Sequence, residues 1–237
     1  MSNTGRKCLI VMAAVVLAGG AAWVLVGILG RPRIDGTTSG DRIQSICRLA
    51  DANPFDAGNV LAEAATKEPD VRVRQAALIG LGRFVDPKVR STVEQCTRDP
   101  SAPVRAAAAI ALGGYGNEAA AARLGEMVRE DPAAEARMGA VIGLGRCATS
   151  ESLVWLVEAA EKDEAPDVQH RAIKELYAKF GARYFGEPSR VPDWPYDAAA
   201  SVEYLKSFPE VQEAFRKAGL GLVRRPEYQW QHHDEPD

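Results

Sequence analysis

The chain has 237 residues, of which 46% are hydrophobic and only 7% aromatic, and its formal net charge is −3. The first 33 residues hold four basic groups and no acidic one, so the remainder carries 25 basic against 32 acidic residues, a charge of about −7. Because the phosphates of nucleic acid need a basic surface, this balance argues against a nucleic-acid partner.

An uncharged run near the start of the chain predicts a transmembrane helix over residues 9–30, after a short tail of residues 1–8. From Leu9 to Leu29 the run contains 21 residues. As a helix rising about 1.5 Å per residue it would reach roughly 30 Å, the thickness of the hydrocarbon core of a bilayer. A cleaved signal peptide is the alternative, with small residues at 18–20 as its cleavage site, but the apolar run continues well past that point. An uncleaved anchor is therefore expected.

The basic residues on the two sides of this segment are nearly balanced. Arg6 and Lys7 precede it, and Arg31 and Arg33 follow it, so the positive-inside rule gives almost a tie. A very short N-terminal tail is usually left in the cytoplasm, which favours a single-pass protein whose main body lies on the periplasmic side. Residues 31–40 are rich in Pro, Gly, Ser and Thr and predict a linker.

An internal repeat is the strongest pattern in the sequence. Three segments align without gaps: RQAALIGLG from Arg74, RAAAAIALG from Arg105 and RMGAVIGLG from Arg137. A weaker fourth copy begins at Arg171, so that the arginines are 31, 32 and 34 residues apart. Each strong copy has Ile five positions after its Arg, then Leu and Gly. This period predicts stacked repeats, because one such unit is too small to bury its apolar face alone.

Each repeat is predicted to contain two helices. The second helix holds the aligned motif, starts after a proline-bearing turn and is expected to end at the motif glycine in a left-handed cap. Small residues in the second helices are predicted to let neighbouring helices approach closely: Ala76, Gly80, Ala107, Ala111, Gly139 and Gly143. The first helices are expected at residues 57–67, 88–98, 117–130 and 151–163, where apolar residues recur every three or four positions.

The motif resembles the HEAT-repeat family, and specifically the short HEAT-like repeats grouped with phycobilisome lyases. The matching residues are Pro103, Val104 and Arg105 followed by AAAAIALGG, and the resemblance covers about residues 56–181. It implies an all-α fold, an α-solenoid of about four helix pairs within residues 41–182. A single amphipathic helix at 41–52 is expected to cover its N-terminal end. An aromatic-rich C-terminal cap (183–222) and a polar tail (223–237) complete the predicted organisation.

The repeated arginines are candidate partner-binding residues. Arg74, Arg105 and Arg137, followed by Arg171, should form a row along one side of the solenoid, where guanidinium groups could bind carboxylates or phosphates of a partner. The favoured alternative is architectural: each Arg bonds an acidic residue or a helix end in its own or the next repeat.

The aromatic C-terminal segment is the second candidate site. Trp194 and Tyr196 lie beside expected apolar helices, and such residues are frequent at interaction hot spots. A hydrophobic cap over the last repeat is the favoured alternative, because an uncapped solenoid end is poorly soluble.

No catalytic, cofactor-binding or metal-binding residue is expected. No Ser or Cys has a credible His partner, and the Gly-Leu-Gly pieces end helices instead of following strands, as a phosphate-binding loop would. Residues 232–235 (HHDE) cannot close a metal coordination shell alone. The sequence also lacks the His-Glu pairs of the HEAT-repeat deoxyhypusine hydroxylases. Cys47, Cys96 and Cys147 form no known motif; buried thiols are favoured over a disulfide between two of them.

These features predict a membrane-anchored adaptor. The anchor would fix its location, and the repeats would bind a protein partner, on the concave face formed by the second helices, without catalysis. Two alternatives remain open from sequence. One is an accessory or lyase-like protein acting on a chromophore or a protein substrate, and the other is a structural component of the envelope.

Overall fold

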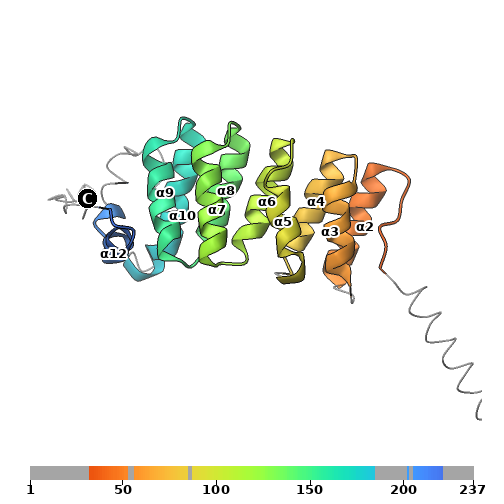
Figure 1. The fold of residues 1–237 in the computed structure, drawn as a ribbon, viewed down its shortest axis with the longest axis horizontal. Helices are drawn as coiled ribbons and strands as arrows, with labels where there is room; N and C mark the ends of the chain where they lie inside the picture. Colours follow the sequence, from red (N-terminus) through yellow and green to blue (C-terminus); the bar gives the residue numbers. More distant parts are fainter. Residues whose placement is uncertain (1–31, 53–55, 85–86, 185–201, 203–204, 221–237) are drawn as a thin grey trace, which may run out of the picture.

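A computed structural model describes residues 32–52, 56–84, 87–184, 202 and 205–220 (Figure 1). These parts are helical and contain no strand, and their elements are α2 (Ser39–Ala52), α3 (Ala57–Lys67), α4 (Val71–Leu81), the 3₁₀ turn η1 (Pro87–Val89), α5 (Arg90–Cys96), α6 (Ala102–Gly113), α7 (Glu118–Glu130), α8 (Ala134–Arg146), α9 (Ser150–Lys162), α10 (Pro166–Tyr184) and α12 (Pro209–Lys217). The prediction of an all-helical solenoid is confirmed.

The helices form two parallel rows (Figure 1). One, the B row, consists of α2, α4, α6, α8 and α10, and each of its members packs on the next. The other, the A row, consists of α3, α5, α7, α9 and α12; α12 packs on α9 and thus extends this row beyond the last repeat. The helix ends agree with the turn chemistry of the sequence: the carboxylate of Asp70, the residue before α4, accepts a hydrogen bond from the amide of Arg72 at 2.8 Å.

A single apolar core runs between the two rows. Its most regular component is the motif leucine, which is fully buried in every repeat: Leu81, Leu112, Leu144 and Leu176. Together with many alanines, these leucines allow helices to pack closely along the whole stack. The buried residues of successive repeats belong to one cluster, so the stack supplies a continuous core that no single helix pair could supply.

The motif glycines do not have the predicted left-handed conformation. Gly82 has φ −62°, and Gly113 and Gly145 lie within the last turns of α6 and α8. They are instead sites of close approach between B helices: a Cβ added at Gly113 would lie 2.5 Å from the Cα of Gly143. The small-residue prediction is correct at Gly139 and Gly143, where an added Cβ would lie 2.5 Å from the Cα of Ala106 and 2.5 Å from the carbonyl oxygen of Ala109; at Gly80 the nearest atom is the side-chain Cδ1 of Leu61, at 3.2 Å.

This close approach distinguishes the B row from the A row in the middle of the stack. Helices α6 and α8 touch through their backbones at Gly139 and Gly143, whereas α5 and α7, opposite them in the A row, scarcely contact each other. In the A row, Arg123 of α7 donates a hydrogen bond from Nε to Oγ1 of Thr97, the residue after α5, at 2.9 Å.

The predicted anchor at residues 9–30 lies outside the described residues. Among the helices that are described, none combines the length and the apolar character needed to cross a bilayer. The described part of the predicted C-terminal cap, residues 202 and 205–220, contains α12, which starts at Pro209 and buries Val211 and Ala214.

Candidate interaction surface

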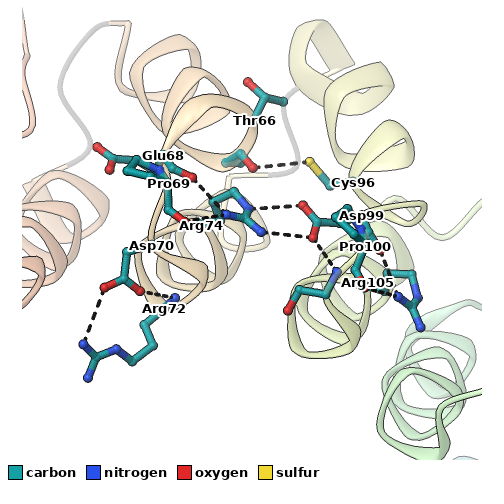
Figure 2. A network of polar contacts seen from close by, with 12 residues as sticks. Thr66, Glu68, Pro69, Asp70, Arg72, Arg74, Cys96, Asp99, Pro100 and Arg105 are labelled. Atoms are coloured by element: carbon teal, nitrogen blue, oxygen red, sulfur yellow. Dashed lines mark hydrogen bonds and ion pairs between the residues drawn. The ribbon is translucent and has the colours of Figure 1, made fainter.

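The motif arginines form a ladder that joins consecutive repeats (Figure 2). Arg74 of α4 donates from Nε and Nη2 to the two carboxylate oxygens of Asp99, both at 3.1 Å. Its Nη1 also donates to the carbonyl oxygens of Glu68, at 3.0 Å, and Pro69, at 3.2 Å. The guanidinium group thus links the turn before its own helix to the corresponding turn of the next repeat.

The same pairing of an arginine with the aspartate of the next repeat, here called a rung of the ladder, recurs twice along the stack. Arg105 donates to Asp131 at 2.7 and 2.8 Å, and Arg137 donates to Asp163 at 2.8 and 2.9 Å. The aspartate of each rung also accepts a hydrogen bond from the backbone amide two residues further on. Bidentate pairing between a guanidinium group and a carboxylate fixes the relative orientation of the two groups and also stabilises their contact.

The rungs are largely shielded from solvent. At the middle rung the side chains of Arg105 and Asp131 are 14% and 7% exposed. Burial alone would raise the pKa of Asp131, but hydrogen bonds from Arg105 and from the amide of Ala133 outweigh it and hold this pKa below its usual value. The hydrogen bond to Asp131 in turn raises the pKa of Arg105. The geometry therefore assigns these arginines an architectural role.

The two ends of the ladder differ from the sequence prediction. In α10 the rung position is held by Gln169, whose Nε2 donates to the carbonyl oxygen of Asp163 at 2.7 Å, as Arg105 does to the carbonyl six residues before it. Arg171 instead pairs with Glu175 within the same helix, at 2.8 Å. The fourth copy therefore begins two residues earlier than its arginine indicates, 32 residues after Arg137.

A further rung at the N-terminal end was missed from the sequence. Arg42 of α2 pairs with Glu68 at 3.3 Å. The available signal was its position, 32 residues before Arg74, which equals the repeat spacing. Helix α2 is therefore the second helix of an incomplete repeat as well as the cap of the N-terminal end.

Partner binding by Arg74, Arg105 and Arg137 stays a prediction, and the ladder leaves little of their side chains exposed, 12%, 14% and 11%. Trp194 and Tyr196 lie outside the described residues. The structure accordingly offers a different surface for a partner.

That surface is a row of isoleucines on the outer face of the B helices, here named the isoleucine stripe: Ile79, Ile110 and Ile142. Each lies five residues after a ladder arginine, on the helix side opposite the buried leucine. Ile79 is 59% exposed, and the other two are partly exposed. Single exposed apolar residues need no explanation, but here one recurs at the same position in three neighbouring helices of the B row.

A second surface, on the A row, was not predicted. Arg129 of α7 donates to both carboxylate oxygens of Glu158 of α9, at 3.0 and 2.9 Å, and lies 4.6 Å from the ring centre of Trp155. The indole packs against the backbone at Gly125. A groove of about 490 Å³ beside this cluster is also lined by Phe215 and other residues of α9 and α12. The sequence signal was weak, because neither the arginine nor the tryptophan belongs to the repeat motif.

No group of three or more His, Cys, Asp or Glu side chains in them is arranged to hold a metal ion, and residues 232–235 lie outside them. Cys47, Cys96 and Cys147 are free thiols, the last two buried. Burial raises the pKa of Cys96 to about 11, so this thiol is a poor nucleophile at neutral pH.

Comparisons with known proteins agree with the fold. A family model for HEAT repeats matches residues 58–145. Among solved structures, the chain is similar to one in the complex of CpcE and CpcF of phycocyanin lyase from Nostoc sp. PCC7120, with 16% identity, a TM-score of 0.52 and coverage of 77% of each chain. At this identity the likeness shows the fold alone. No curated protein matches the sequence significantly.

Proposed function

We propose that this chain is a HEAT-repeat adaptor that binds a protein partner on the B face and performs no chemistry of its own. The observation that carries the proposal is the isoleucine stripe, because Ile79, Ile110 and Ile142 contribute apolar surface where the core does not require it. The ladder supports it indirectly by fixing each repeat to the next, so that the stripe is presented as a rigid surface.

The capture of a partner from native membranes tests this function. Full-length tagged protein is cross-linked before solubilisation, and we expect one strongly enriched, saturable partner that is absent from an anchor-only control. The variant Ile79→Asp should lose most of this enrichment. Its thermal stability should stay unchanged, because the side chain of Ile79 is largely exposed. The matched control is Glu126→Lys, a charge change at an exposed A-row position. Equal capture by both variants would remove the B face from the proposal.

The proposal includes a membrane anchor at residues 9–30 and a solenoid on the periplasmic side. Its support is the uncharged run of 21 residues, long enough to span a bilayer. We expect the protein to stay in the membrane fraction after an alkaline carbonate wash, with residues 1–30 intact by mass spectrometry. Recovery of a soluble protein whose N-terminus lies near Ala21 would show that the segment is a cleaved signal.

A lyase-like role is the second candidate. Its support is the likeness in fold to a chain of a phycocyanin lyase complex, together with the A-row groove beside Trp155. An absorption band from a co-purified chromophore, lost when the lining of this groove is changed, would favour it over the adaptor. A colourless protein with a stable protein partner would favour the adaptor.

A further inference from the structure

Three basic side chains, Arg83, Arg146 and Lys174, lie beside the isoleucine stripe or in line with it, although the chain beyond its first 33 residues is acidic. Arg83 and Arg146 follow Ile79 and Ile142 by four residues; Arg146 lies one helical turn further along α8, and Arg83 lies in the turn just after α4. In α10 an exposed lysine, Lys174, takes the position of the isoleucine. The A-row helices α7 and α9, by contrast, carry more acidic than basic residues.

The two arginines lie at the seams between B helices. Arg83 donates from Nη1 to Oδ1 of Asp51 in α2, at 2.6 Å, and Arg146 donates from Nη1 to the carbonyl oxygen of Ile110 in α6, at 3.1 Å. Each therefore reaches back to the preceding helix of the row. Arg83 is 58% exposed in its side chain, and each guanidinium has five N–H donors, so a partner's carboxylate can also be bound here.

We propose that the stripe binds an acidic amphipathic helix, an inference that rests on the adaptor function proposed above. Neighbouring helices pack about 8–10 Å apart, so the isoleucines recur at roughly that interval along the B row. In an α-helix, residues seven apart are separated by about 10.5 Å and lie on nearly the same face. In a β-strand, residues three apart span a similar distance but point to opposite faces. Carboxylates beside the aliphatic residues of the partner would meet Arg83, Arg146 and Lys174.

A displayed library of random peptides, long enough to span two intervals of the stripe, tests this proposal on the full-length protein in detergent. We expect selected peptides to be acidic and to carry Leu, Ile or Val seven positions apart. The double variant Arg83→Glu with Arg146→Glu should bind them about tenfold more weakly or worse, because two attractive charge pairs become repulsive. Peptides with lysine in place of their acidic residues should regain binding to this variant.

The variant Glu126→Lys is the control for a change of charge away from the stripe and should bind the peptides as the parent does. Selected peptides that are basic, or acidic peptides that bind the double variant as tightly as the parent, would overturn the proposal. If capture from membranes depends on Ile79 but no acidic peptide is selected, only this inference fails. If capture is independent of Ile79, the adaptor function on this face fails as well.

Discussion

Replacing Arg105→Ala is expected to lower the free energy of unfolding by about 3 kcal/mol, the lower end of the range for breaking a buried ion pair. The change leaves the carboxylate of Asp131, 7% exposed, without its charged partner, and it leaves the carbonyl groups of Asp99 and Pro100 without a donor. The lower end applies because Asp131 keeps the hydrogen bond from the amide of Ala133. Urea unfolding of the full-length protein, followed by circular dichroism at 222 nm, measures the effect.

The matched control is Arg171→Ala, which removes the arginine of the fourth sequence copy. This side chain is 40% exposed and pairs only one turn along its own helix, with Glu175, so we expect a loss of less than about 0.5 kcal/mol. Equal losses for the two variants would show that the rung at Arg105 contributes no more than a surface pair. Loss of partner capture by Arg105→Ala at unchanged stability would instead assign this arginine to recognition.

The repeats and most helix bounds could be predicted because their causes are local. Proline-bearing turns and apolar residues spaced at helical intervals predicted 57–67, which the structure places at the same bounds, and 117–130 and 151–163, which it shifts by a residue or less. The predicted helix at 88–98 divides into η1 and α5. Local sequence patterns predict the helix bounds reliably here because the same pattern recurs in each repeat.

The register of the fourth repeat could not be predicted from the arginine column. A glutamine at 169 preserves the hydrogen bond to a carbonyl without preserving charge; among the described residues, no aspartate of a following repeat pairs with it. The sequence alignment placed the start of the fourth copy at Arg171 only because the other three copies begin with an arginine. The fully buried Leu176, seven positions after Gln169, is the feature that fixes the correct register, and burial is not visible in one sequence.

The sequence shows which residues recur on the candidate binding surface, but it does not show which of them are exposed. The recurrence of Ile five positions after each motif arginine is plain, but only packing shows that Ile79 faces solvent while Leu81 is buried. The pairing of Arg146 with the backbone of Ile110 joins residues 36 positions apart and depends on how closely α6 and α8 approach. Such contacts between repeats follow from the stack and not from the motif.

The close approach of α6 and α8 gives the second large prediction. Gly139→Ala is expected to lower the free energy of unfolding by about 2 kcal/mol, although alanine is the better helix former by about 1 kcal/mol. The added Cβ would lie 2.5 Å from the Cα and 2.6 Å from the carbonyl oxygen of Ala106. Backbone atoms cannot rotate away, so the two helices must separate. Urea unfolding of the full-length protein measures the loss.

Gly80→Ala is the matched control, because the atoms nearest to an added Cβ at this position belong to side chains, which can move. There the nearest atom to an added Cβ is the Cδ1 of Leu61, at 3.2 Å, and the next is the Cβ of Ala50, at 3.5 Å. We expect no loss, or a gain of up to about 1 kcal/mol from helix propensity. A Gly139→Ala variant as stable as Gly80→Ala would mean that α6 and α8 lie further apart than described.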